Sequence, residues 1–231
     1  MLRLGCDHWL AQGGDWGSTI THVLAQQRPA GVVAAHVNWQ LVVPALPPAN
    51  MTNEESAVYA DIQRHADSRG KLAGYFRMQA TKPQTIAYAL LDSPLAQASW
   101  IYEKLHDWTD HEDHSEALTI DETLDDTSLY TFAGTAGSAA RFYWENSRST
   151  FPFGLNAGAI DLPMTATVFQ KETIRPPRAW AAALWSRLYY GTSSKSAVIS
   201  LPGSKRLFLS KSSERPFNRF DFCVARSRAN H

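Results

Sequence analysis

The chain has 231 residues, of which 44% are hydrophobic, and it carries eight Trp, eight Tyr and ten Phe. This length and composition can bury a core, which excludes global disorder. Lys plus Arg and Asp plus Glu both number 22, so no basic surplus indicates nucleic-acid binding. Two cysteines, Cys6 and Cys223, are too few for a disulfide scaffold. With no apolar run near the roughly 20 residues of a membrane span and no signal-peptide pattern, we expect a soluble, cytoplasmic protein.

The first 40 residues predict one β-α-β unit. Residues 9–13 favour a short strand, and the turn Gly-Gly-Asp-Trp-Gly follows at 13–17. Apolar residues then recur at helical spacing over 20–24, until Pro29 ends the helix. The apolar run 32–37 is typical of a buried parallel strand.

Between about residues 40 and 160 the pattern becomes helical. Three prolines between 44 and 48 mark a linker, and no strand-like alternation follows it. Helical patterns rich in Trp and Tyr cover roughly 52–65, 70–80, 83–91, 95–106, 120–133 and 135–146. A strand pattern returns at 163–169, and a helix opens within 175–180. The sequence therefore predicts an all-helical lid inserted into a sheet protein.

The turn at 13–17 has the form of a nucleophile elbow, in which a strained central residue projects above a sheet. Glycine is expected at both flanks, because such a turn packs too closely for Cβ atoms. Asp15 takes the place at which esterases have serine. A carboxylate is already ionised at pH 7 and needs no base for a first attack, and the backbone N–H of Trp16 can stabilise an oxyanion. The alternative, an ordinary Gly-rich turn, is weakened by the strand before it and the helix after it.

Several motifs, in order, resemble the microsomal-type epoxide hydrolases of the α/β-hydrolase superfamily. They extend over about residues 1–190 and lie at 11–18, 75–94, 100–104, 135–145, 169–172 and 175–180. The resemblance implies an α/β protein with a partial α/β-hydrolase fold, a parallel-sheet remnant carrying the inserted helical lid. Its expected domains are the hydrolase core at 1–40, the lid at 41–160, the continued core at 161–190 and a non-family tail at 191–231.

The resemblance also implies a reaction, the opening of epoxides to vicinal diols through an ester on an aspartate. Asp15 matches the nucleophile, and Tyr75 and Tyr143 match two lid tyrosines that donate to the epoxide oxygen. Glu172 matches the acid that orients a water-activating histidine. Without the family, both tyrosines would be interpreted as packing residues and Glu172 as a solvated loop carboxylate. The expected substrate is a small apolar epoxide. No cofactor, metal or nucleic acid is implied, and the oligomeric state stays open.

Other polar residues receive structural interpretations. The cluster Asp-His-Glu-Asp-His at 110–114 has no recognised metal-ligand spacing, so a polar loop is favoured. Lys82 belongs to the Thr-Lys-Pro block of the family motif. His36, in the apolar strand, is interpreted as a satisfied buried histidine and not as a base.

The family pattern is incomplete at both ends of the chain. The strands and the His-Gly-x-Pro oxyanion loop that precede the elbow have no counterpart, and neither has the Gly-Gly-His-Phe-Ala-Ala segment with the catalytic histidine. The one histidine after Glu172 is His231. We therefore expect an open sheet edge and an inactive fragment. A haloalkane or haloacetate dehalogenase, which also uses an elbow aspartate, and a non-catalytic ligand- or partner-binding remnant are the alternatives. The tyrosine pair argues against the dehalogenase.

The tail from Gly191 differs from the rest of the chain. It holds eight Lys or Arg and two Asp or Glu, a net +6, whereas the remainder holds 14 and 20, a net −6. Stepping back one base, the codons of residues 197–202 can encode Gly-His-Phe-Ala-Ala. These observations predict that the tail is translated out of frame and that none of its residues is catalytic.

Overall fold

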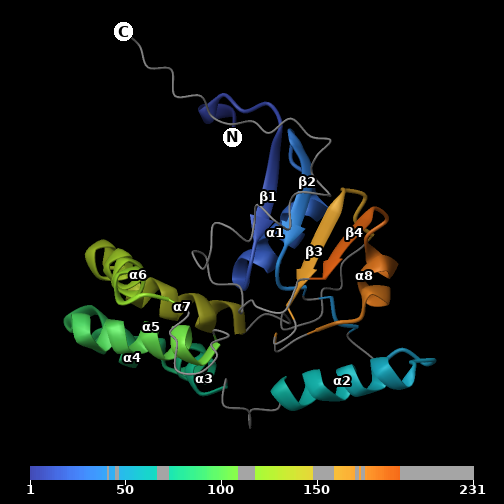
Figure 1. Ribbon diagram of the computed structural model, residues 1–231. Coiled ribbons are helices and arrows are strands. Elements are labelled where there is room, and N and C mark those ends of the chain that lie inside the picture. Colours follow the sequence, from blue (N-terminus) through green and yellow to red (C-terminus); the bar gives the residue numbers. More distant parts are fainter. Residues whose placement is uncertain are drawn as a thin grey trace. The chain divides into compact units, whose positions relative to one another are not determined.

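The structure is a computed structural model, and it describes residues 1–40, 42–44, 47–66, 73–108, 118–147, 159–169, 172 and 175–192. The chain divides into two compact units (Figure 1). The sheet unit is formed by Met1–Val42 and the chain from Asn156 onward, and the helical unit by Val43–Leu155. These limits lie near, but not at, the expected lid boundaries of 41 and 160. The tail after 192 and the 110–114 cluster lie outside the described residues.

The sheet unit is built on four parallel strands in the order β1-β2-β3-β4 (Figure 1). Their bounds are β1 (Trp9–Gly13), β2 (Val32–Val37), β3 (Met164–Val168) and β4 (Leu188–Thr192). The predicted strands at 9–13, 32–37 and 163–169 are confirmed, the last one residue shorter at each end. β2 and β3 are buried over almost their whole length, as strands covered on both faces should be.

β4 extends past the last residue of the family motifs. Gly191 pairs with Thr167 and Thr192 with Val168, so the strand continues two residues into the segment expected to be non-family tail. Main-chain hydrogen bonds need no particular side chain, so β3 can template this pairing for almost any sequence.

Two helices and a short 3-10 turn complete the described part of the sheet unit. They are α1 (Trp16–Gln27), α8 (Arg178–Leu184) and η1 (Leu2–Leu4). α1 connects β1 to β2 and packs against both, which makes the predicted β-α-β unit. It ends where Arg28 adopts the left-handed conformation, one residue before Pro29. Small buried residues in the strands, Ala34, Ala35 and Ala166, leave room for close packing on the sheet.

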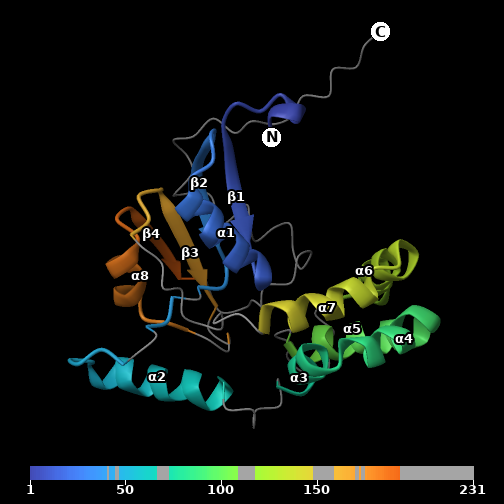
Figure 2. The same ribbon diagram turned by 180° about the vertical axis from the view of Figure 1, so that it is seen from behind.

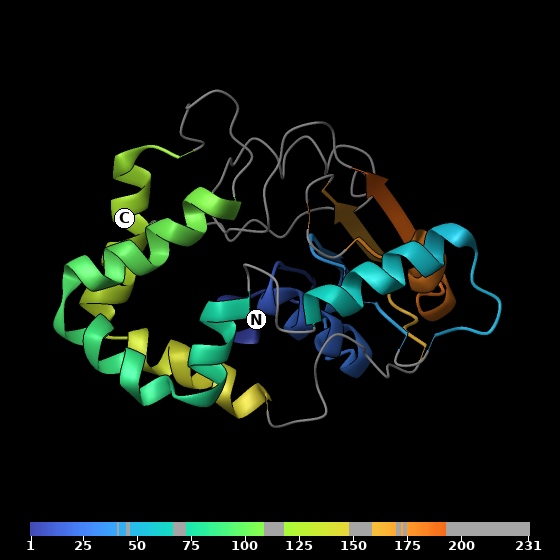
Figure 3. The same cartoon turned by 90° about the horizontal axis from the view of Figure 1, so that it is seen from below.

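The regular secondary structure among the described residues of the helical unit is all helical. The bounds are α2 (Asn53–Ala66), α3 (Ala73–Thr81), α4 (Pro83–Asp92), α5 (Pro94–Trp108), α6 (Ile120–Ala133) and α7 (Ala136–Ser147). Each predicted helix is present within a few residues of its expected ends. α7 packs against α3 and α4, and α5 packs against α4 and α6; the turned views keep these helices together (Figures 2 and 3).

Local signals explain why these helices begin and end where they do. Pro83 and Pro94 occupy first-turn positions, at which proline loses no hydrogen bond. Thr119 and Glu122 form a reciprocal capping box at the start of α6, and Gly134 ends that helix at φ 61°. No described helix is long and apolar enough to cross a bilayer.

Candidate active site

Asp15 has an unusual backbone conformation, with φ 47° and ψ −128°. Among the described non-glycine residues, only Arg28 shares a positive φ. Arg28 lies in the ordinary left-handed region at a helix end, whereas the ψ of Asp15 places it outside that region. The strained turn predicted from the sequence is therefore present, and strain of this kind persists only where the surrounding structure enforces it.

The turn at 13–17 is tightly packed at Gly13 but not at Gly17. A Cβ atom at Gly13 would lie 2.0 Å from the carbonyl oxygen of Gly17 and 2.5 Å from the hydroxyl of Thr21. A Cβ atom at Gly17 would meet nothing within 4 Å. The expectation that both flanks require glycine is thus right for Gly13 and wrong for Gly17, because only the first residue has its Cβ direction pointing into the helix backbone. The Ser18 hydroxyl donates to the Gly13 carbonyl at 2.9 Å and closes the turn.

The Asp15 carboxylate lies at the amino end of α1 without capping it. Burial raises the pKa of this carboxyl group from 3.8 to about 6, and a hydrogen bond from the backbone N–H of Trp16 opposes the rise. Because this value lies below 7, the carboxylate is mainly ionised at neutral pH, as a nucleophile requires. The result is a poorly solvated carboxylate with one backbone donor directed at its oxygen atoms.

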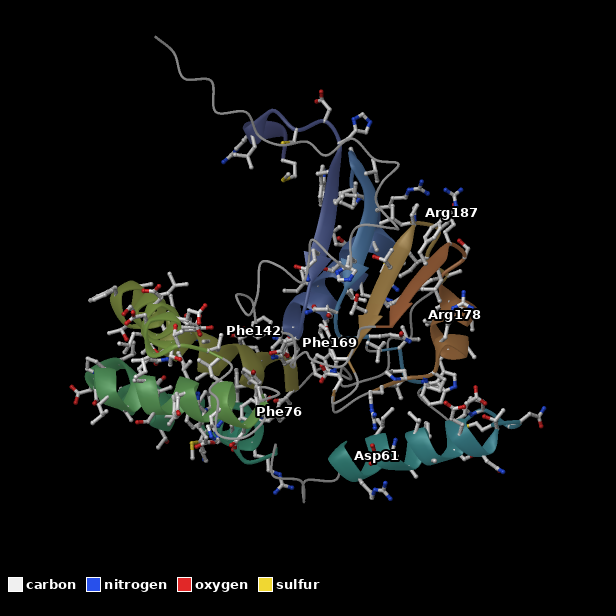
Figure 4. All side chains as sticks on the ribbon, in the orientation of Figure 1. Asp61, Phe76, Phe142, Phe169, Arg178 and Arg187 are labelled. Atoms are coloured by element: carbon white, nitrogen blue, oxygen red, sulfur yellow. The ribbon has the colours of Figure 1, made fainter. Side chains whose placement is uncertain are left out.

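Glu172 follows β3 and is buried, with 4% of its surface exposed. Its backbone N–H donates to the carbonyl of Phe169, which Figure 4 labels beside the end of β3. The interpretation as a solvated loop carboxylate is therefore wrong. β1 and β3 are parallel strands on either side of β2, so Asp15 and Glu172 both follow carboxyl ends at the same edge of the sheet.

Among the described residues of the sheet unit, two histidines, His22 and His36, are buried, and burial lowers the pKa of each to about 4. His36 Nε2 lies 3.0 Å from the hydroxyl of Thr167, which confirms the interpretation as a satisfied buried histidine. No sequence pattern singles out His22, whose ring centroid lies 5.6 Å from that of Trp185. It lies seven residues beyond Asp15 on α1, about 10 Å along the helix. His231 lies outside the described residues.

In the helical unit the structure brings Tyr75 and Tyr143 together. Their ring centroids are 5.9 Å apart, at an interplanar angle of 79°. Trp108 contacts Tyr75 at 5.1 Å, and Phe76, labelled in Figure 4, contacts Tyr143 at 5.5 Å. Because α3 packs on α7, two tyrosines from distant parts of the sequence share one aromatic cluster.

Lys104 also belongs to this aromatic cluster, although the sequence motifs did not single it out. The Lys104 ammonium nitrogen lies 5.4 Å from the ring centroid of Tyr75 and 5.0 Å from that of Trp100. Trp100, Lys104 and Trp108 recur every four residues on α5, and this spacing was a signal that they share a face. Lys82, by contrast, is exposed before α4.

The predicted site residues are thus distributed over both units, Asp15 and Glu172 in the sheet unit and Tyr75 and Tyr143 in the helical unit. Within the described part of the chain, no three His, Cys, Asp or Glu side chains gather as potential metal ligands.

Similarity to individual known proteins identifies the family. No family model matches the chain. A putative epoxide hydrolase of Stigmatella aurantiaca is 47% identical over 192 residues, which cover 82% of this chain and 42% of that protein. The chain belongs to the epoxide hydrolase family. Epoxide hydrolase 1 of Sus scrofa is 29% identical over 208 residues, covering 81% of this family member and 46% of the pig protein. The chain spans about half the length of the curated relatives it matches.

Solved structures of epoxide hydrolases have the same fold. The juvenile hormone epoxide hydrolase of Bombyx mori superposes with a TM-score of 0.68 at 22% identity, over 86% of this chain and 52% of that one. The Aspergillus niger epoxide hydrolase gives 0.66 at 24% identity, over 84% and 48%. The predicted fold class, a partial α/β-hydrolase fold with a helical insertion, is confirmed.

Proposed function

We propose that this epoxide hydrolase family member forms an ester between Asp15 and a small apolar epoxide. A carboxylate oxygen attacks a ring carbon, the carbon–oxygen bond of the epoxide breaks, and the released alkoxide takes a proton from Tyr75 or Tyr143. The observation that carries the proposal is the strained Asp15, whose poorly solvated carboxylate stands at the amino end of α1. The contact between the two tyrosine rings adds support, because paired donors share the developing charge.

The second half of the reaction is hydrolysis of the ester. Water adds to the ester carbonyl, and the Trp16 N–H, which already donates to the Asp15 carboxylate, is suited to hold the oxyanion. This step needs a general base, in the family a histidine oriented by the acid that Glu172 matches. Burial lowers the pKa of His22 and His36 to about 4, so both are weak bases inside the sheet unit and neither is proposed for the role. We propose that this chain completes the first half-reaction and releases diol slowly.

Intact-mass measurement of the full chain after incubation with styrene oxide tests the proposal. The expected result is one added styrene oxide mass per chain, located by peptide mapping on the fragment that contains Asp15. Asp15→Asn should abolish the adduct, whereas Asp7→Asn, on an exposed bend before β1, should retain it. An adduct that survives in Asp15→Asn would rule out the nucleophile assignment. Repeated formation of diol by the unmodified chain would contradict the half-reaction.

The relatives named above favour this proposal over the dehalogenase alternative, since their names assign epoxide hydrolysis to them. The same mapping after incubation with a chloroalkane separates the two, because a dehalogenase would take the alkyl group onto its aspartate and release chloride. A cytoplasmic location stays a proposal that rests on the low cysteine count.

A further inference from the structure

Lys104 is a cation that is largely withdrawn from solvent within the aromatic cluster. Its side chain is 14% exposed, and its ammonium lies over the rings of both Tyr75 and Trp100. Both nitrogen–centroid distances are below about 6 Å, the range in which a cation is attracted to the electron-rich face of an aromatic ring. A lysine usually keeps its ammonium in water, so two ring faces and low exposure call for a reason.

Two of the contacts of Tyr75 come from one face of α5. Lys104 lies over the ring of Tyr75, and Trp108, one turn further along, meets that ring edge-on at 5.1 Å. Trp100, one turn earlier, also has its ring against the ammonium, at 5.0 Å from the nitrogen to the ring centroid. The ring of Tyr75 is therefore fixed by α5 and by Tyr143 from α7, and the charge of Lys104 has a defined place against it.

We propose that Lys104 is a positioning residue for Tyr75, whose ring it holds and whose hydroxyl it makes a stronger proton donor. A cation close to a phenol stabilises the phenolate and so favours transfer of the proton to a developing alkoxide. The inference rests on the proposed function, because it assumes that Tyr75 donates to the epoxide oxygen.

The charged neighbours set the strength of this effect. Glu103, the residue before Lys104, forms an ion pair with its ammonium and is 63% exposed. Its charge partly offsets that of the lysine. On α7, Tyr143 is the titratable group in ring contact with Tyr75, and the exposed pair Arg141 and Glu145 on the same helix joins opposite charges at 2.7 Å. Lys104 and Glu103 are therefore the charges to vary.

The test measures the titration of Tyr75 in the full chain, by NMR of tyrosine labelled at the Cζ carbon. Tyr75→Phe identifies the signal. In Lys104→Met the titration midpoint should rise by about one pH unit, while Lys104→Arg should keep it at or below the original value. Glu103→Gln should lower the midpoint, since it removes the opposing charge. Lys82→Met removes an exposed lysine of the same unit and should leave the midpoint in place.

This measurement needs no catalysis, so it separates the inference from the proposed function. If the midpoint moves as stated but Tyr75→Phe forms the Asp15 ester at the original rate, the charge effect stands and the donor role of Tyr75 fails. An unchanged midpoint in both Lys104→Met and Glu103→Gln would overturn the inference. Circular dichroism checks that each variant folds, and if Lys104→Met does not, the Glu103→Gln result alone decides.

Discussion

Asp15 combines two costs that a structural residue would avoid, a strained backbone and a poorly solvated charge. Because burial raises its pKa to about 6, the fraction of nucleophilic carboxylate changes near neutral pH. The rate of ester formation with styrene oxide should therefore increase with pH, reach half its maximum near pH 6, and level off above pH 7. Intact-mass measurement of the ester in reactions quenched at set times, between pH 4.5 and 8, gives this profile. A midpoint near 4 would show that the carboxylate is solvated as an ordinary aspartate.

The two glycines that flank Asp15, Gly13 and Gly17, should differ in how well they tolerate alanine. Gly13→Ala should destabilise the protein by about 3 kcal/mol or more, because its Cβ would overlap backbone atoms that cannot move away. Gly17→Ala should be neutral or stabilise by up to about 0.5 kcal/mol, since alanine favours a helix and its Cβ meets open space. Urea unfolding of both variants measures the difference. Equal losses would refute the one-sided packing of the elbow.

At the scale of single elements, the helices of the helical unit carry their own boundary signals. Thr119 accepts a hydrogen bond from the N–H of Glu122 at 3.2 Å, and Glu122 accepts one from the N–H of Thr119 at 2.8 Å. Thr119→Ala should cost about 1 kcal/mol through the loss of this box, whereas Thr119→Ser should restore most of it. The free energy of unfolding checks both. A loss of the same size in Thr119→Ser would point to the methyl group instead of the hydroxyl.

These local signals explain how much of the fold could be predicted. Proline at the first turn, a capping box and a terminal glycine act over a few residues, so the ends of α4, α5 and α6 could be read from the sequence. The burial of Glu172 and His22 could not, because it depends on segments that meet only in the folded sheet unit. Tyr75 and Tyr143 were placed in one site by resemblance alone, and the charge of Lys104 against Tyr75 arises from packing between helices.

At the scale of the whole molecule, the chain spans about half of its curated relatives. The predicted change of frame near Gly191 bears on the catalytic histidine directly. Restoring one base near codon 191 should give a reading frame with Gly-His-Phe-Ala-Ala, and the protein expressed from it should form diol from styrene oxide repeatedly. Nucleotide sequencing comes first. If no histidine-containing strand and helix emerges, the segment is a genuine divergent C-terminus.

The helical unit enters and leaves the sheet unit once, as the continuous stretch Val43–Leu155. Such a continuous stretch can be exchanged as one segment. Recombination at its two junctions would exchange the tyrosines, Lys104 and the surrounding rings together, and would leave the strained aspartate after β1 and the buried glutamate after β3. A lineage could in this way change, in one event, all the lid residues that the proposed function places at the epoxide, while Asp15 stayed unaltered.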